Sequence, residues 1–594
     1  MNDIDMNIYD YIVSKNKNLD NRIALSYFNR RFTFKEVIDN INKVMNSLQS
    51  FEVKENDNVV YLGFATPEFV FLMYALAKMN VTLNILNPMD SSNYESIIKR
   101  LHPKLIFCYD KFFNEISEKV EKDKIIITSP FESLPYPFRF TNNLVSLLSN
   151  NNLSGGTRYS DFIKRNSETN KVYIKDSFIA NSKIIEIGTG GSTGIPKLVG
   201  ISNEMLNNVV YQHKLMNENN VFDVSFNDNE RFLDIIPPHL AYGICDIHLA
   251  LSLRLNLCLE PNPNPKLFIK QLKKYKPHHV LAGPVHWKEL ILYDKKLDLS
   301  CLKNAVAGGE HLENSDEIET NRKLKLNNSK TTVKEGVGLT EICGVGTYNS
   351  SNYMFTVGRP LPNYQVGIFK YNMNEENNDN IKSSDEIAKI FFEKQGNGEL
   401  RIKSLGMIGK NNQGEICYQL PVKILGYVGE EHKKEQDNLI RMHEDGLEWI
   451  HTGDIGYINE DLNLIITDRI KRVFNRNGWK IYPTYLSKIV CDSNLIKECT
   501  IIKRKSINNG ESYVPILYAV LKEDTINNRE KLICWCNDKL TNNYKLEDII
   551  FLDELPKTTS GKINFNLVEK YDELYNINGN NKKKILIKDF YTKE

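Results

Sequence analysis

Hydrophobic and polar positions follow two different periods along the first part of the chain. Val59–Leu62 and Lys104–Cys108 are short apolar runs of the kind that form buried strands, whereas Phe69–Met79 is long enough for an apolar helix. An amphipathic helix is predicted to begin after Thr33, whose hydroxyl is suited to an N-cap. Strands that alternate with helices in this way predict an α/β fold with a parallel sheet.

The same alternation returns between residues 230 and 345. Strands are predicted there at Phe232-Leu233, Leu257–Leu259, His279–Leu281 and Ala305-Val306. From residue 471 the chain becomes more charged, which predicts a small α+β domain over 471–594 after a large domain over 1–470. Residues 371–412 are polar and rich in asparagine, and we expect this insert to lie on the surface as a loop.

Composition narrows the class of protein. A chain of 594 residues is too long for one core, and its 41% hydrophobic and 25% charged residues are typical of globular proteins. The net charge of +1 gives no reason to expect nucleic acid or an anionic membrane as the main partner. The most apolar stretch, Val59–Ala77, is interrupted by Pro67 and Glu68, so we expect no transmembrane segment. Ten scattered cysteines without zinc-ligand spacing favour a reduced, cytoplasmic protein.

A glycine-rich segment, Gly188–Lys197, carries the most specific chemistry. It reads Gly-Thr-Gly-Gly-Ser-Thr-Gly-Ile-Pro-Lys and follows the predicted strand Ile184–Ile187. Glycines let backbone N–H groups converge on an anion, hydroxyls donate hydrogen bonds, and lysine adds a positive charge. The spacing matches neither a Walker A loop nor a dinucleotide fingerprint. We therefore predict a loop that binds the phosphates of a nucleoside triphosphate.

Five further motifs follow this loop in order. They are Gly308-Gly309-Glu310, Gly338-Leu339-Thr340-Glu341, His451-Thr452-Gly453-Asp454, Asp468-Arg469-Ile470-Lys471 with Gly478-Trp479-Lys480, and Lys557-Thr558-Thr559-Ser560-Gly561-Lys562. Each alone could be an ordinary turn, helix cap or solvated loop. Together, in this order and spacing, they resemble the adenylate-forming superfamily of acyl-CoA synthetases, aryl-acid ligases, luciferases and peptide-synthetase adenylation domains. The resemblance extends from about Thr33 to Val568.

This resemblance implies a fold and a reaction. The fold would be a large adenylation domain with parallel sheets and a β-subdomain, followed by a small, mobile C-terminal domain. The reaction would convert a carboxylic acid and ATP, with Mg²⁺, to an acyl-adenylate and pyrophosphate, and would then transfer the acyl group to the thiol of CoA. Because two anions must meet, the site has to neutralise charge at the α-phosphate and hold the carboxylate in line.

The resemblance also implies roles for particular residues. The phosphate loop is matched by Thr189, Gly191, Ser192, Thr193, Gly194 and Lys197. The rest of the nucleotide site is matched by Gly308, Gly309, Glu310, Val337, Gly338, Asp454 and Arg469, with both ribose hydroxyls accepted by the aspartate. Thr340 would contact the α-phosphate, Glu341 would hold Mg²⁺, and Lys562 would bridge carboxylate and α-phosphate. Lys471 matches the hinge, and Gly478 lies on the side of the incoming thiol.

The acyl pocket is implied at His239 and Tyr242. His239 follows two prolines and resembles the gating residue of the family, although its distance to Gly243 is one residue longer than usual. The alternative is a structural histidine whose ring nitrogens are paired inside the fold.

Several positions depart from the family pattern. Val337 stands where an aromatic residue usually stacks on adenine, while Tyr485 and Phe565 replace a usual glutamate and arginine. The last two lie in the C-terminal domain and bear on the thiol half-reaction. Gly190, Leu198 and Asn475 also depart from the common pattern, but similar variants occur in aryl-acid ligases.

Three alternatives accompany the first interpretation, a fatty acid–CoA ligase. The acid could be an aryl acid, or the acceptor could be the thiol of a separate carrier protein. The chain could also be a non-catalytic ATP-binding homologue, a hypothesis motivated by the departures and opposed by the presence of Thr340, Glu341, Asp454, Arg469 and Lys562.

Overall fold

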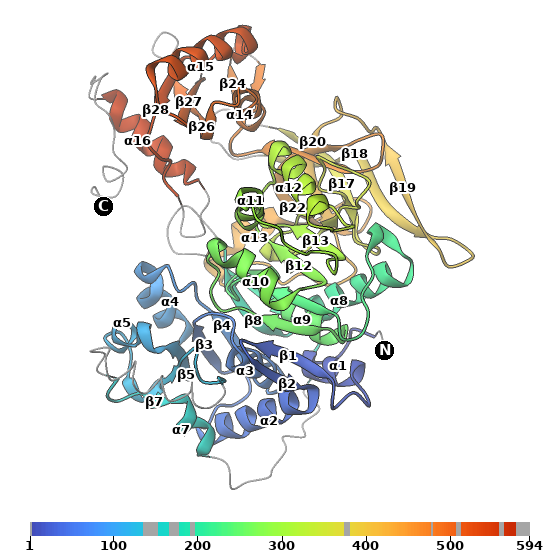
Figure 1. Ribbon diagram of the computed structural model, residues 1–594, viewed down its shortest axis with the longest axis vertical. Coiled ribbons are helices and arrows are strands. Elements are labelled where there is room, and N and C mark those ends of the chain that lie inside the picture. Colours follow the sequence, from blue (N-terminus) through green and yellow to red (C-terminus); the bar gives the residue numbers. More distant parts are fainter. Residues whose placement is uncertain are drawn as a thin grey trace.

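The computed structural model describes residues 3–134, 153–165, 178–189, 197–372, 381–476, 479–506, 513–557 and 563–577 (Figure 1). Within these residues, two seven-stranded sheets form the centre of the large domain. The first has the order β7-β6-β5-β3-β4-β8-β9 and is parallel except between β8 and β9. Its strands are β3 (Asn58–Leu62), β4 (Thr82–Ile85), β5 (Leu105–Tyr109), β6 (Ile125–Thr128), β7 (Thr157–Arg158), β8 (Lys183–Gly188) and β9 (Leu198–Ser202).

The second sheet has the order β14-β13-β12-β10-β11-β1-β2 and is antiparallel only between β1 and β2. Its strands are β1 (Ile23–Tyr27), β2 (Arg30–Thr33), β10 (Arg231–Asp234), β11 (Asn256–Leu259), β12 (His279–Ala282), β13 (Asn304–Ala307) and β14 (Val333–Glu335). All the strands predicted from the apolar runs are present, so the α/β prediction is confirmed.

Helices α1 (Ile8–Lys15), α3 (Pro67–Lys78), α8 (Asn203–Glu218) and α9 (Ala241–Ser252) pack together between the two sheets. Helix α3 contacts β4 and β8 of one sheet, and α9 contacts β10 and β11 of the other. Every residue of α3 is buried, which explains why its sequence is apolar on all sides. Helix α2 (Phe34–Ser50) begins as predicted, because Thr33 and Glu36 form a capping box.

Further helices are α4 (Tyr94–Leu101), α5 (Phe113–Ser117), α7 (Tyr159–Lys164), α10 (Phe268–Tyr275), α11 (Pro284–Leu292), α12 (Asn314–Leu326) and α13 (Lys433–Leu439). None of the helices in the described ranges is both long and apolar enough to cross a membrane.

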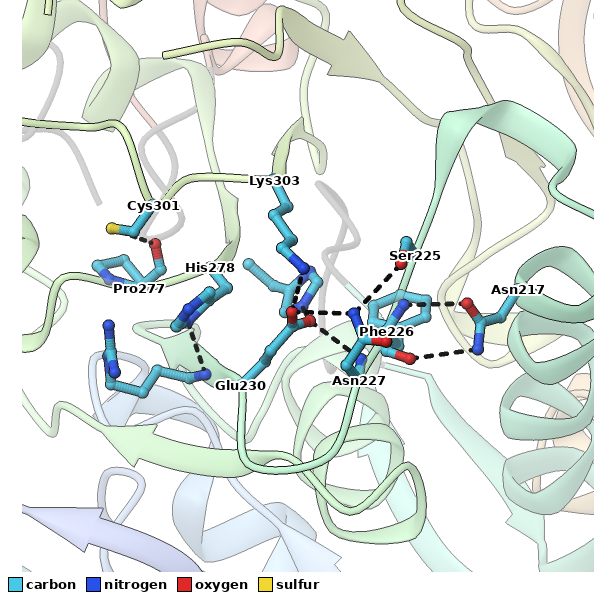
Figure 2. Close-up of polar contacts among 11 residues, drawn as sticks. Asn217, Ser225, Phe226, Asn227, Glu230, Pro277, His278, Cys301 and Lys303 are labelled. Carbon is cyan, nitrogen blue, oxygen red and sulfur yellow. Dashed lines mark hydrogen bonds and ion pairs between the residues drawn. The ribbon is translucent and has the colours of Figure 1, made fainter. Parts of the chain in front are cut away.

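Glu230 fastens the amino ends of three neighbouring strands of the second sheet (Figure 2). It directly precedes β10, and its carboxylate accepts two hydrogen bonds from Asn227 and one from Lys303, the residue before β13. His279, the first residue of β12, places Nε2 2.8 Å from the same carboxylate. These contacts lie at the amino ends of the strands. In open α/β sheets, ligand sites form from loops at the opposite, carboxyl ends of the strands.

A third sheet is antiparallel and forms the β-subdomain. Its order is β19-β18-β17-β20-β22-β21, with β23 also paired to β22. The strands are β17 (Gln365–Asn372), β18 (Ile381–Lys394), β19 (Leu400–Gly406), β20 (Gly414–Gln419), β21 (Ile440–Met442), β22 (Glu448–Ile458) and β23 (Leu464–Arg469). Two short strands, β15 (Thr347–Tyr348) and β16 (Arg359–Pro360), form a separate pair.

The expectation of a surface loop over 371–412 is corrected by this sheet. Residues 381–406 contain two of its strands, and β18 pairs with both β17 and β19. Ala388 and Ile390, two residues apart, are buried on one face of β18. The asparagine-rich composition concealed this alternation, and residues 373–380 lie outside the described ranges.

The C-terminal part is a small α+β unit, shown in orange and red at one end of the molecule in Figure 1. Its elements are β24 (Phe474–Arg476), β25 (Trp479–Ile481), α14 (Pro483–Cys491), β26 (Ile496–Lys505), β27 (Tyr513–Leu521), α15 (Ile526–Lys539), β28 (Asp548–Phe551) and α16 (Phe565–Ile577). Strands β26, β27 and β28 form one sheet with its own hydrophobic core. The boundary at 470/471 stays a prediction.

Candidate active site

The predicted phosphate loop lies between β8 and β9. The Thr189 N–H donates to the Lys197 carbonyl at 2.8 Å, which closes the base of the loop. Residues 190–196, and with them the predicted ligands Gly191, Ser192, Thr193 and Gly194, lie outside the described ranges.

Tyr427 connects this loop base to the Thr-Glu motif. Lys197 forms an ion pair with Glu435 at 3.1 Å, and its ammonium lies 5.0 Å from the centre of the Tyr427 ring. The Tyr427 hydroxyl donates to Glu341 Oε1 at 2.8 Å. Because β9 pairs with the segment around Tyr427 through Val199, two motifs far apart in the sequence are held together. The sequence analysis missed Tyr427, since no local pattern marks it.

Thr340 and Glu341 lie on a short 3-10 turn, Thr340–Ile342, just beyond β14. The turn is tied down by hydrogen bonds from the Cys343 N–H to the Thr340 carbonyl and from the Gly344 N–H to the Leu339 carbonyl. Both motif residues remain partly exposed. None of the described residues donates a hydrogen bond to Glu341 Oε2, so this carboxylate oxygen is open to a cation. Mg²⁺ fits such a position, because it usually binds one or two protein carboxylates together with phosphate oxygens.

Three glycines allow the loops at the carboxyl edge of the second sheet to approach one another. A Cβ added to Gly338 would lie 2.0 Å from the Gly344 carbonyl oxygen, and one added to Gly344 would lie 2.9 Å from the Tyr242 backbone nitrogen. A Cβ on Gly309 would lie 2.9 Å from the Tyr242 hydroxyl, and its φ of +84° also favours glycine. The structure thus brings the predicted residues Gly309, Gly338 and Tyr242 together.

The predicted acyl pocket region contains buried groups without hydrogen-bond partners. Among the described residues, none pairs with Nδ1 of His239, and burial lowers the pKa of its ring to about 4. The pocket role of His239 and the alternative of a structural histidine both stay predictions. Asp234, at the carboxyl end of β10, and Asp246, on α9, are also buried, and each has an oxygen without a partner in that part of the chain.

These two carboxyl groups influence each other. Burial raises the pKa of Asp234 to about 7. Burial and repulsion from Asp234 raise the pKa of Asp246 well above its usual range. Burial also raises the pKa of the Tyr242 phenol, to which Asp246, Glu310 and Asp234 contribute. The region is therefore less uniformly apolar than a pocket for a plain hydrocarbon chain would be. The sequence analysis did not identify either aspartate.

Asp454 and Arg469 face each other on neighbouring strands β22 and β23. Arg469 Nε donates to Asp454 Oδ1 at 2.8 Å, with the arginine side chain 63% exposed and the aspartate side chain 10% exposed. A buried carboxylate beside an exposed guanidinium offers acceptors and donors to a ribose, as the resemblance implies.

Buried polar residues hold the turn before Asp454 in place. Glu415 accepts a hydrogen bond from the Gly453 N–H at 3.0 Å, and its other oxygen lies 2.9 Å from His451 Nδ1. His451 Nε2 in turn lies 2.9 Å from His443 Nε2, and burial lowers the pKa of His443 to about 4. Gly453 has φ of +73°, a conformation that favours glycine. The sequence analysis did not identify Glu415 or His443.

Glu415, Cys417 and His451 form the one group found among the described residues whose ligand atoms are close enough to hold a metal. All three side chains are buried, and the Glu415 oxygens contact Gly453 and His451. The Glu415 carboxylate therefore has hydrogen-bond partners without a bound ion. We infer that these three residues stabilise the turn at Gly453.

The segment that leads into the C-terminal domain begins at the predicted hinge. Lys471 is exposed in a turn, and Arg472 beside it stacks over Phe565 at 4.0 Å. Asp468 accepts hydrogen bonds from the N–H and the hydroxyl of Thr484, in the first turn of α14, at 2.8 and 2.9 Å. A carboxylate from β23 therefore caps the first helix of the C-terminal domain.

Two predicted residues of the C-terminal domain lie outside the described ranges, namely Gly478 and Lys562. The described neighbours of Lys562 pair with each other, since Lys557 and Ile563 form a β-bridge. Of the departing positions, Tyr485 is exposed and Phe565 lies against Arg472.

Two family models match this chain. The model of the family "AMP-binding enzyme" matches residues 14–408, and that of "AMP-binding enzyme C-terminal domain" matches residues 488–562. The chain belongs to the AMP-binding enzyme family. The resemblance noted from the motifs is thereby confirmed, and the chain belongs to a family of enzymes whose members include acid–CoA ligases and luciferases.

Relatives with assigned names cover most of the chain. The long-chain-fatty-acid–CoA ligase of Bacillus subtilis is 24% identical and is matched over 91% of this chain and 90% of its own length. A probable 4-coumarate–CoA ligase of Dictyostelium discoideum is 24% identical over 89% of both chains.

Solved structures share the fold. An anthranilate CoA ligase, AuaEII, in complex with anthranoyl-AMP, superposes with a TM-score of 0.73 at 16% identity, covering 96% of this chain and 97% of that one. The ATP-bound MatB of Rhodopseudomonas palustris gives a TM-score of 0.74 at 17% identity, covering 96% and 100%. A large adenylation domain with a β-subdomain and a small C-terminal domain is thus the fold of this chain.

Proposed function

We propose that this enzyme is an AMP-forming acid–CoA ligase. It activates a carboxylic acid with ATP to an acyl-adenylate and pyrophosphate, and then transfers the acyl group to CoA. The observation that supports the proposal is that Tyr427 contacts both Lys197, at the end of the predicted phosphate loop, and Glu341 of the Thr-Glu motif. Membership of the family supports it.

The described residues have distinct tasks in the first half-reaction. Lys197 and the Thr189 end of the loop attract the β- and γ-phosphates, Thr340 donates to the α-phosphate, and Asp454 with Arg469 orients the ribose. Glu341 would hold a magnesium ion, which supplies positive charge against the developing negative charge of the phosphates. Tyr427 fixes the Glu341 carboxylate by its hydrogen bond.

The C-terminal domain supplies the mobile part of the proposal. Lys562 bridges the carboxylate and the α-phosphate during adenylation, and rotation about Lys471 then withdraws it. Gly478 would border the path of the incoming thiol after this rotation.

We propose two classes of acid substrate. A fatty acid is the first proposal, supported by the B. subtilis relative that acts on long-chain fatty acids. An aryl acid is the second, favoured by the buried carboxyl groups of Asp234 and Asp246 beside Tyr242, because a polar ring substituent could hydrogen-bond to them. The solved anthranilate and benzoate CoA ligases support this class. Replacement of Asp246 by Asn should change the ratio of aryl to fatty acid turnover if the second class is correct.

The remaining alternatives are a carrier-protein thiol in place of CoA and a non-catalytic ATP-binding homologue. A cytoplasmic location and the absence of nucleic-acid partners also stay proposals. All ten cysteines are free thiols in the structure, which fits a reducing compartment.

The test is pyrophosphate release from the purified protein with Mg-ATP and a panel of fatty, aryl and amino acids, with and without CoA. Acid-dependent release that is sustained only with CoA is expected. Release in a single burst with or without CoA would indicate another acceptor, and no release with any acid despite ATP binding would contradict the proposal.

Lys562→Ala is expected to slow adenylation by roughly 100-fold or more. Lys557→Ala, in the same segment, removes only an exposed ion pair with Glu498 and is the matched control. Near-normal adenylation by Lys562→Ala would refute the assigned role.

A further inference from the structure

Two pairs of cysteines touch in this structure, and their surroundings differ. Cys245 and Cys343 place their sulfur atoms 3.4 Å apart, and Cys491 and Cys499 place theirs 3.6 Å apart. The first pair is buried in the large domain, with residue exposures of 3% and 1%. Cys491 and Cys499, in contrast, are both partly exposed.

Cys491 and Cys499 lie on adjacent elements of the C-terminal domain. Cys491 is the last residue of α14 and Cys499 is on β26, and this helix and strand pack against each other. The sulfur atoms lie 3.6 Å apart, and an S–S bond is about 2 Å long. Bond formation therefore requires them to approach by only about 1.5 Å. Geometry therefore permits a disulfide within the domain.

The electrostatic surroundings favour Cys491 as the attacking sulfur. The hydrogen bond between the two sulfur atoms lowers the pKa of Cys491, with a smaller contribution from Lys288 on α11. Burial of the Cys491 thiol, together with Glu313 and Asp492, raises this pKa but does not reverse the effect. The same hydrogen bond, together with burial, raises the pKa of Cys499, while burial raises the pKa of Cys245 in the other pair. Thiolate character and access, which together control thiol exchange, thus coincide at Cys491.

We propose that Cys491 and Cys499 form a redox-active dithiol that reacts with small disulfides such as glutathione disulfide. The Cys491 thiolate attacks one sulfur of glutathione disulfide, the S–S bond breaks, and one glutathione thiolate leaves. The Cys499 thiol gives up its proton and attacks the Cys491 sulfur, which expels the second glutathione as a thiolate. The two thiolates leave as two glutathione thiols once each has taken a proton, so the protein dithiol loses two electrons and two protons.

The position of Cys491 gives this chemistry a structural consequence. Its surroundings include Lys288 and Glu313, which belong to the large domain at α11 and next to α12. A glutathione adduct at Cys491 would therefore lie near these residues of the large domain, and closure of the disulfide would remove it.

The experiment uses the full-length protein, equilibrated with glutathione buffers from fully reduced to fully oxidised. Free thiols are alkylated, and the modified peptides are identified by mass spectrometry. Loss of two thiols, located at Cys491 and Cys499, is expected, while Cys245 and Cys343 stay reduced. Full recovery with excess reduced glutathione should follow.

Two substitutions separate the roles of the sulfurs. Cys499→Ser should leave Cys491 as a stable mixed disulfide with glutathione, because no second thiol is present to release it. Cys491→Ser should greatly slow modification of Cys499. The double variant Cys245→Ser/Cys343→Ser is the matched control and should oxidise at Cys491 and Cys499 as the unchanged protein does.

Three results would overturn the proposal. The first is that Cys491 and Cys499 stay reduced in fully oxidised glutathione. The second is that the buried pair oxidises first. The third is that the exposed Cys534, which has no sulfur neighbour among the described residues, reacts as fast as Cys491. Thermal unfolding of each variant verifies that it is folded, so a loss of reactivity can be assigned to the sulfur.

Discussion

Replacement of Gly338 by alanine should distort the turn that carries Thr340 and Glu341. The new methyl group would lie 2.0 Å from the carbonyl oxygen of Gly344, whereas ordinary contact begins at 3.4 Å. The opposing backbone would have to retreat by about 1.4 Å, the difference between these two distances. It has little room, because Gly344 itself lies against the backbone of Tyr242.

The magnitude follows from this close packing. Overfilling a packed site usually costs about 1–3 kcal/mol, and here the clash involves backbone rather than a flexible side chain. If the turn instead shifts to relieve the clash, the same free energy reduces the population of molecules in which Thr340 and Glu341 are correctly placed. This population should fall by about 5- to 150-fold.

Thermal unfolding and acid-dependent ATP–pyrophosphate exchange measure the two outcomes. Gly338→Ala should lower the unfolding temperature, the rate of exchange, or both. Gly308→Ala is the control for stability, since the nearest atom to its new methyl group is 3.9 Å away, and its unfolding temperature should not change. The reasoning is refuted if Gly338→Ala unfolds at the temperature of the unchanged protein and exchanges pyrophosphate at the same rate.

Other predictions concern single contacts. Tyr427→Phe should slow adenylation by about tenfold or more, because Glu341 loses a hydrogen bond to a charged group, and a normal exchange rate would contradict this. Asp454→Asn should raise the KM for ATP by about tenfold or more with a smaller change in kcat, since ribose contacts and the partner of Arg469 are weakened; an unchanged KM would count against it. Burial lowers the pKa of His213 from 6.5 to about 4. The unfolded chain therefore binds the extra proton first, so stability should fall as the pH falls from about 6.5 to about 4. His213→Met should lose less stability over that range in urea titrations, and an identical pH dependence would argue against the assignment.

Local sequence signals predicted the large domain well. The apolar run at Val59–Leu62 is β3, and the Thr33 cap opens α2 with Glu36 as its capping-box partner. Such features depend on neighbours within a few residues, which the sequence displays directly. The insert was misread because its polar composition hid an alternating strand, β18, whose partners lie on either side in the sheet.

The site could be predicted only where its residues belong to motifs. Asp454 and Arg469 were found in this way, and their direct contact in the structure is consistent with a shared ligand. Tyr427 and Glu415 were not found, because each acts through a partner more than thirty residues away. A hydrogen bond of that range leaves no period in the sequence, so only the folded chain reveals it.

The cap that Asp468 places on α14 affects how the populations of different domain orientations are balanced. If the C-terminal domain reorients about Lys471 as proposed, Thr484 separates from this carboxylate, because the two lie on opposite sides of the proposed hinge. A helix cap stabilises by about 0.5–2 kcal/mol, so it favours the present orientation by about 2- to 30-fold over one that is otherwise equal. The domain would then spend more of its time in the present orientation. A change at Asp468, a residue assigned no substrate contact, is therefore expected to shift the balance between the two half-reactions by altering how long each orientation lasts.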